Sequence, residues 1–160
     1  MSVKTQGTHL FFVDSTQPEP SVVKMGCPTG IQGATNGARD QIDDTCLDAT
    51  EDRSFTSGLG NPGASTVPFI LKPQDGSHLS LFELKKSGVK LPWLVALSDG
   101  IAAPTLSTDG SLDISAIDRT TIEFTAYVAD VDIDIATNEV VRGTLTLQRS
   151  GSFNFVPKQV

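Results

Sequence analysis

The sequence predicts a mainly β fold, an antiparallel β-sandwich or flattened barrel with one flanking α-helix and a long assembly loop. Three observations predict this class. The 160 residues include 14 glycines and nine prolines, which is typical of a fold with many turns. The apolar segments are rich in Val, Ile, Thr and Phe, which favour strands. Only one segment carries the signals of a helix. A chain of this length forms one domain, and we expect residues 1–160 to do so.

The first strands are expected at 7–13, with the sequence GTHLFFV, and at 21–25, after a break at Pro18 and Pro20. Another strand is expected at 66–72. Between these segments, residues 26–65 are rich in Gly, Asp, Thr, Ser and Asn. A compact domain rarely holds a loop of this length unless the loop is functional or disordered.

We interpret the ends of this long loop as strands and its centre, at 58–65, as a mobile excursion. A disordered linker is the alternative, but the flanking pieces look too small to be separate domains. The stretch from Arg39 to Phe55 holds six acidic residues and three large apolar ones, Ile42, Leu47 and Phe55. These apolar side chains would let the acidic loop dock on a partner.

The single helix is expected at about 77–87. Asp75 and Ser77 can cap its first turn, and Gly88 can end it in the left-handed conformation. Lys85 and Lys86 lie in the last turn, where cations favour the helix dipole. The expected apolar stripe consists of Leu79, Leu81, Phe82 and Leu84.

After the helix, the sequence predicts strands at 93–98, 120–135, 140–149 and 152–156, with turns at Thr137–Asn138 and Ser150–Gly151. In the longest of them the apolar positions change phase, from Ile122, Phe124, Ala126 and Val128 to Val131, Ile133 and Ile135. Side chains alternate between the faces of a strand, so this change requires an extra residue. We therefore predict a β-bulge or bend near Ala129.

Composition argues against several classes of protein. The formal net charge of −7 disfavours a nucleic-acid-binding protein, because that affinity comes mainly from Lys and Arg. We find no signal sequence, no membrane-spanning stretch and no motif of a catalytic, metal or cofactor site. The acidic cluster after Arg39 lacks the pattern of a calcium loop. We expect no enzyme activity, no cofactor, and two free thiols at Cys27 and Cys46, with a disulfide as the alternative.

Asp130, Asp132 and Asp134 occur at every second position of the longest predicted strand. Their side chains should therefore share one face of the sheet. One interpretation is an ordinary solvated face. The other is a surface that must not bind anions, since a row of like charges costs stability through self-repulsion.

Several segments in this order are similar to the major tail tube proteins of long, non-contractile bacteriophage tails. They are CPTGIQG at 27–33, RDQIDDTCLD at 39–48, SFTSGLGNPG at 54–63 and LTLQRSG at 145–151, with the capped helix between the last two. The resemblance extends over nearly the whole chain. Individual segments are weakly specific, and their order and spacing carry the resemblance.

This resemblance implies that six subunits form a ring and that rings stack into a tail tube for DNA delivery. The partners would be the chain itself, a tape measure protein, a tail terminator and distal tail or baseplate proteins. DNA would pass through the lumen without specific binding. The protein would be made in the host bacterial cytoplasm and would reside in the virion tail, with no membrane association and no added C-terminal immunoglobulin-like domain.

The resemblance assigns subunit or ring contacts to loop residues Asp40, Asp43, Thr45, Leu47 and Asp48. It makes Asp130, Asp132 and Asp134 candidates for the lumen. Three other functions stay open from the sequence. They are a ring-forming tail terminator or distal tail protein, a secreted tube protein of an injection machine, and a monomeric β module that binds a ligand such as carbohydrate.

Overall fold

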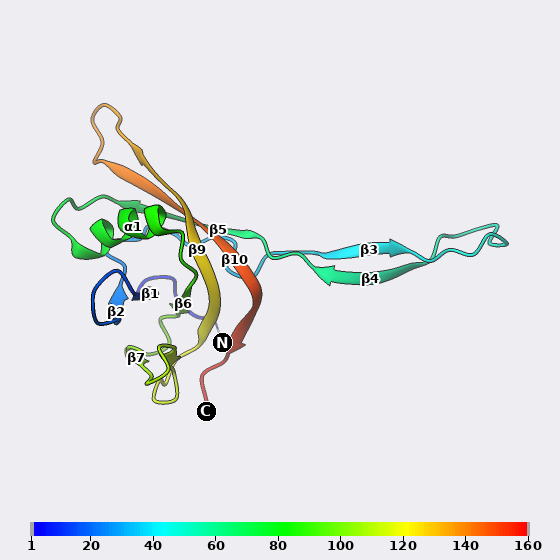
Figure 1. Cartoon of the computed structure of the whole chain (residues 1–160), viewed down its shortest axis with the longest axis horizontal. Coiled ribbons are helices and arrows are strands. Elements are labelled where there is room, and N and C mark those ends of the chain that lie inside the picture. Colours follow the sequence, from blue (N-terminus) through cyan, green and yellow to red (C-terminus); the bar gives the residue numbers. More distant parts are fainter. Residues whose placement is uncertain (1, 160) are drawn as a thin grey trace.

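The computed structural model describes residues 2–159, and this part of the chain forms ten strands and one helix (Figure 1). The elements are β1 (His9–Asp14), β2 (Ser21–Lys24), β3 (Arg39–Asp43), β4 (Phe55–Gly60), β5 (Ala64–Ile70), α1 (Gly76–Ser87), β6 (Leu91–Ala96), β7 (Thr105–Leu106), β8 (Leu112–Asp113), β9 (Thr121–Asp134) and β10 (Arg142–Val156). The predicted class, mainly β and antiparallel with one flanking helix, is confirmed.

The body of the protein is a six-stranded antiparallel sheet in the order β2-β1-β6-β9-β10-β5. Phe12 of β1 and Phe69 of β5 lie near opposite ends of this order, yet both belong to one buried cluster. The sheet must therefore curl around that cluster, as the curvature of β9 and β10 in Figure 1 shows. At its centre Trp93 stacks on Phe12 with ring centroids 4.9 Å apart and donates a hydrogen bond to the Ala126 carbonyl.

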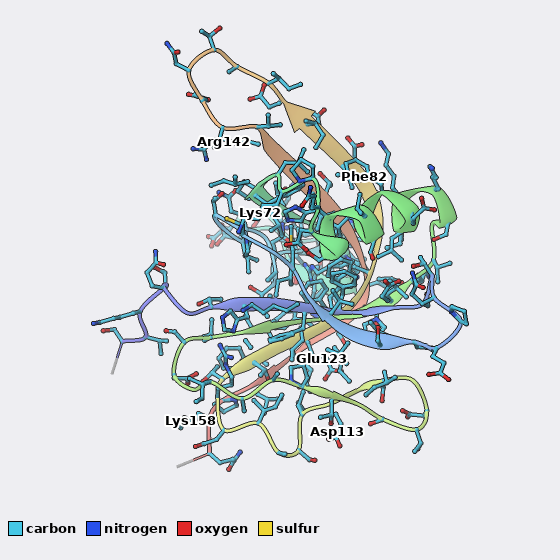
Figure 2. All side chains as sticks on the ribbon, turned by 90° about the vertical axis from the view of Figure 1, so that its left-hand side faces the viewer. Lys72, Phe82, Asp113, Glu123, Arg142 and Lys158 are labelled. Carbon is cyan, nitrogen blue, oxygen red and sulfur yellow. The ribbon has the colours of Figure 1, made fainter. Side chains whose placement is uncertain are left out.

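A second, smaller cluster lies on the other face of β1 and β6. It consists of Phe11, Val13, Leu94, Ala96 and Leu112. Leu112 belongs to the β7–β8 excursion, which lies below the sheet in Figure 2, where Asp113 is labelled. Strands β1 and β6 are thus covered on both faces, which explains their unbroken runs of buried residues.

Helix α1 has the predicted caps. The Asp75 side chain accepts a hydrogen bond from the Ser77 amide, and Gly88 ends the helix with φ of 65°. The predicted apolar stripe is partly wrong, because Leu79 is 55% exposed while His78 is buried. His78 Nδ1 accepts from the Lys72 amide at 3.0 Å, so Nε2 carries the proton and donates to the Gly26 carbonyl at 2.6 Å. These two bonds satisfy a buried polar ring that the apolar periodicity did not indicate.

The predicted bulge is confirmed at Ala129. Val128 pairs with Leu147 and Asp130 pairs with Thr146, so Ala129 has no partner in β10. The extra residue moves the buried face of β9 from even to odd positions, and Val131 after the bulge is buried like Val128 before it.

The predicted turn at Ser150–Gly151 is wrong, because β10 continues through it to Val156. The pairing with β9 instead shifts register between Ser150 and Asn154, where Gly151 adopts φ of 79°. The glycine thus absorbs an irregularity inside one long strand. Ile135, expected on the apolar face, lies just beyond β9 and is exposed.

Candidate assembly surfaces

Strands β3 and β4 form a two-stranded hairpin that projects far from the body, and we call residues 37–62 the arm (Figure 1). Residues 58–65, predicted as a mobile excursion, instead belong largely to β4 and the start of β5, and the chain reverses at 44–54. The glycines of β4 suggested a loop. A Cβ at Gly58 would lie 3.2 Å from the Asp40 Cβ, so this glycine lets the two strands approach closely.

No residue of β3 or β4 is buried. The arm exposes four large apolar side chains, those of Ile42, Leu47, Phe55 and Leu59. An isolated two-stranded hairpin is marginally stable in water at best, because it lacks a hydrophobic core. The arm therefore has the composition of a segment that completes its packing against something else.

Polar hydrogen bonds shape the tip of the arm. The Ser54 amide donates to Thr45 Oγ1 at 2.8 Å, and that hydroxyl donates to the Ser54 carbonyl. Hydrogen bonds from Thr45 lower the pKa of Asp43, and the hydroxyl of Thr56 lowers the pKa of Asp44. The ionised carboxylates thus help to hold the reversal in shape.

All five loop residues predicted to make contacts lie on this arm. Asp40 and Asp43 belong to β3, whereas Thr45, Leu47 and Asp48 lie in the tip. Leu47 is fully exposed, while Thr45 is half-buried and bonded within the tip. The structure therefore places all five residues on one projection. The Leu47 side chain is exposed there, whereas the Thr45 hydroxyl is hydrogen-bonded within the tip.

The base of the arm depends on residues that the sequence analysis missed. Asn36 Nδ2 donates to the Ala64 carbonyl at 3.2 Å, and its Oδ1 accepts from Arg149 Nη2 at 2.9 Å. Arg149 is buried, and burial lowers the pKa of its guanidinium. A Cβ at Gly63 would lie 2.5 Å from Asn36 Oδ1, so a glycine is needed there. The cluster of glycines in 26–65 was the available signal.

The segment that leads into the arm covers the outer edge of β5. The Thr29 amide donates to the Pro68 carbonyl at 2.8 Å, and Gln32 and Thr66 exchange two backbone bonds of 2.9 Å each. Pro68 has no N–H to offer, which suits a strand next to such an irregular cover. The edge of β5 is thereby closed to other strands.

Asp130, Asp132 and Asp134 are exposed on the outer face of β9, opposite Thr146, Thr144 and Arg142 of β10. The three aspartate side chains are exposed, whereas β7–β8 covers the corresponding face of β1 and β6. Lys85 Nζ lies 2.9 Å from Asp130 Oδ1, and this contact lowers the pKa of Asp130. Asp130 thus differs from the other two aspartates, whose side chains have no ion pair among the described residues.

Arg119 is another residue that the sequence analysis missed. Only 1% of it is exposed, and burial lowers the pKa of its guanidinium. It donates to four backbone carbonyls, those of Gly7, Ala96, Leu97 and Ala102, at 2.6–3.3 Å. Arg119 therefore fastens the N-terminal segment and the loop after β6 to the end of the sheet.

A groove of about 570 Å³ lies between the N-terminal segment and residues 28–34. Its floor includes Val95, Leu97 and Ile122, and no Asp, Glu, Lys, Arg or His lines it. The lining includes the hydroxyls of Thr5, Thr8 and Thr29, but it holds no acidic or basic side chain that could activate them. In the part of the chain that the structure describes, no group of three His, Cys, Asp or Glu side chains is arranged to hold a metal. Over the same residues, no helix is long and apolar enough to cross a membrane.

Comparison with known proteins identifies a matching family and a relative by sequence, and solved structures with a similar fold. A family model described as phage tail tube, TTP, lambda-like, matches residues 1–159. A curated relative, structural protein 3 of Pseudomonas phage PAJU2, is 40% identical over 161 residues, which cover 98% of this chain and 94% of the relative.

Solved structures with a similar fold come from several tubes. The tail of a gene transfer agent particle, refined with C6 symmetry, has a TM-score of 0.65 at 12% identity over 97% of this chain and 99% of that one. The SPP1 tail tube has a TM-score of 0.59 at 12% identity over 98% and 81%. A chain in the structure of the sheath/tube terminator of an extracellular contractile injection system has a TM-score of 0.66 at 12% identity over 98% of this chain and 97% of that one. At these identities the likeness concerns the fold.

Proposed function

Because the chain belongs to the lambda-like phage tail tube family, we propose that six copies form a ring and that such rings stack into the tube of a phage tail. Family membership makes the protein a structural component of the virion. The ring, its stacking and the residues that make the contacts are the proposal.

The observation that carries the proposal is the arm. A hairpin with no buried residue and four exposed apolar side chains is stable when another surface covers it. The partner is a second copy, in the same ring or the next one. Leu47 enters an apolar site on that copy, while Asp40, Asp43 and Asp48 lie around it, and Thr45 keeps the tip in shape.

Six-fold closure is supported by the gene transfer agent tail, which shares this fold and was refined with C6 symmetry. A contact between two different surfaces of neighbouring copies closes into a ring when the rotation fits, and a second such contact stacks the rings. One contact lies between copies of the same ring. The arm, which extends beyond the body, is suited to the second contact, between stacked rings.

The outer face of β9 and β10 is proposed to line the lumen. It carries hydroxyl-bearing side chains on β10 and exposed Asp132 and Asp134 on β9. DNA carries one negative charge per about 1.7 Å of axis, so carboxylates in the lumen would keep the phosphates from binding. Asp130 contributes less, because Lys85 neutralises it.

The assembly implies further partners. A tape measure protein would occupy the lumen during assembly, a terminator would cap one end of the tube, and distal tail or baseplate proteins would start the other. The fold recurs in the structure of a sheath/tube terminator, which supports contact between tube and cap. The role is structural.

Negative-stain electron microscopy of the concentrated, purified chain tests the proposal, with distal tail proteins added as a nucleus in a parallel sample. We expect hollow tubes of stacked rings. Isolated rings that do not stack would favour a terminator or distal tail function. Monomers in both samples would contradict the proposal and favour the ligand-binding module.

A further inference from the structure

The base of the arm contains a buried cation that lacks a carboxylate partner. Arg149 is 4% exposed, and none of the ion pairs among residues 2–159 includes it. Its Nη2 donates to Asn36 Oδ1 at 2.9 Å, while its buried Nε has no hydrogen-bond partner in the same part of the chain. Buried charges are usually paired, because an unpaired one costs stability. Arg149 is therefore a candidate for a role other than stabilising the fold.

The orientation of the Asn36 side chain is fixed by its two neighbours. The Ala64 carbonyl can only accept a hydrogen bond, and the Arg149 guanidinium can only donate one. Nδ2 of Asn36 therefore faces Ala64 at 3.2 Å, and Oδ1 faces Arg149 at 2.9 Å. The side-chain carbonyl is thus held against a positive charge, which polarises it and makes Cγ more open to attack by a nucleophile.

A nucleophile for Cγ is supplied by the next peptide group. Asn36 is followed by Gly37, which is the one Asn-Gly step in the sequence. The Gly37 amide donates no hydrogen bond within residues 2–159, and both residues are exposed to water. Gly37 has φ of 129°, and a Cβ there would lie 2.5 Å from the Asn61 carbonyl oxygen, so the position requires glycine. Without a side chain, the Gly37 nitrogen is unshielded.

We propose that Asn36 is a site of self-catalysed deamidation in which Arg149 stabilises the oxyanion. The Gly37 nitrogen loses its proton to water and forms a bond to Asn36 Cγ. The electrons of the carbonyl move to Oδ1, where the Arg149 guanidinium lies against the negative charge. The carbonyl then re-forms as the Cγ–Nδ2 bond breaks, and Nδ2 leaves with the transferred proton as ammonia. The product is a succinimide ring that joins Cγ to the Gly37 nitrogen.

Water opens this ring in one of two ways. Attack at Cγ breaks the new bond to the Gly37 nitrogen and leaves an ordinary aspartate. Attack at the backbone carbonyl carbon of residue 36 breaks the original peptide bond and leaves isoaspartate, in which the main chain runs through Cγ. Arg149 lies beside Oδ1 and stabilises the oxyanion that forms on attack at Cγ. Arg149 therefore affects the product as well as the rate.

The aspartate product gives Arg149 the carboxylate that it lacks. The bond from Nη2 then becomes charge-assisted on both sides, which is the stronger kind, although the donor to the Ala64 carbonyl is lost. The new ion pair joins the base of the arm to β10, beside which the arm leaves the body (Figure 1). Each converted copy also gains one negative charge there. The reaction needs only the folded chain and water, so it does not depend on assembly.

The first test measures the products in the folded and in the unfolded chain. The purified protein is kept at mildly alkaline pH in buffer or in guanidinium chloride, and trypsin then releases residues 25–39, between Lys24 and Arg39. Liquid chromatography with mass spectrometry separates the three forms, with Asn36→Asp as the aspartate standard. We expect mainly aspartate from the folded protein and mainly isoaspartate from the unfolded chain. Asn138, which precedes a glutamate, is the internal control and should stay intact.

The second test removes the planar donor at Oδ1. Arg149→Lys keeps a positive charge but lacks the rigid fork of the guanidinium. In the folded protein it should slow the loss of Asn36 about ten-fold or more and shift the product toward isoaspartate. In denaturant both chains should react at the same rate, because the contact is absent there. Circular dichroism verifies that the variant folds. A purely structural role for Arg149 predicts the opposite, since a looser arm base would speed ring closure.

Three results would overturn the inference. They are a folded protein in which Asn36 stays intact while the unfolded chain reacts, the same ratio of aspartate to isoaspartate in both states, and a faster reaction in folded Arg149→Lys. If that variant does not fold, the first two results still decide. None of these measurements depends on tubes. Failure of the unmodified protein to assemble would contradict the proposed function and leave this inference intact.

Discussion

The body and the arm of this protein are held by different forces. In the body, aromatic and aliphatic side chains from five strands and the helix fill one cluster around Trp93. The arm buries nothing and depends on its backbone ladder and on the bonds between Thr45 and Ser54. The body is therefore specified by its own core. In the proposed assembly, the arm is instead specified by a surface of a second copy, and its sequence forms half of that interface.

The largest effect that separates the two regions should come from the core. Trp93→Ala removes a fully buried ring and its hydrogen bond to Ala126, so we expect the free energy of unfolding to fall by about 3–5 kcal/mol. Chemical denaturation followed by circular dichroism measures it. Leu79→Ala, at an exposed site of α1, is the control and should cost much less. Equal losses would contradict the position of the core.

The arm should show the opposite behaviour. Leu47→Asp places a charge on the exposed tip, so it should leave the unfolding free energy nearly unchanged and abolish tube formation. Leu47→Met keeps an apolar side chain and should assemble. Light scattering against concentration measures assembly, and thermal melting measures the fold. A Leu47→Asp variant that still forms tubes would remove the arm tip from the interface.

A third effect concerns the tube rather than its assembly. Asp132→Lys with Asp134→Lys reverses the two unpaired charges on the proposed lumen face. The tubes should still form, but they should retain DNA in low salt and release it as salt rises. Filter binding of labelled DNA measures this, with the unmodified tube as the control. If both tubes retain equally little DNA, these aspartates face somewhere other than the lumen.

The smallest effect is expected at low pH in the arm tip. Hydrogen bonds from Thr45 hold the pKa of Asp43 below its ordinary value. Their contribution is complete above that ordinary value, about 3.9, and is lost as pH falls through the lower folded value. Acidification should therefore loosen the tip, which lower protection factors of the Thr45 and Ser54 amides, corrected for the intrinsic pH dependence of exchange, would report. Asp43→Asn should resemble the acidified protein at neutral pH, and no change in exchange in that variant would contradict the assignment.

Local signals predicted local features well. The caps at Asp75 and Gly88 gave the bounds of α1 to within a residue, and the phase change of the apolar positions located the bulge at Ala129. Both depend on residues near each other in the chain. Alternation also placed Asp130, Asp132 and Asp134 on one exposed face, whereas the pairing of Asp130 with Lys85 joins distant segments and had no signal.

The features that the sequence analysis predicted wrongly or did not find also have physical reasons. Gly58 and Gly60 suggested a loop because glycine weakens strands, yet close packing against β3 makes Gly58 suitable. Ser150–Gly151 suggested a turn because a long strand with an internal irregularity has the same local sequence. Arg119 and Arg149 are buried by segments remote in sequence. The resemblance assigned subunit or ring contacts to five residues that all lie on the arm, and the sequence analysis missed the base that supports the arm.

A cryo-electron microscopy reconstruction of the assembled protein tests the central claim most directly, because it reveals the surroundings of the arm. We expect a tube of stacked six-membered rings in which Leu47 is buried against a different copy from the one that carries it. An assembly in which the arms project into solvent and touch no other copy would show that the arm is not an assembly interface.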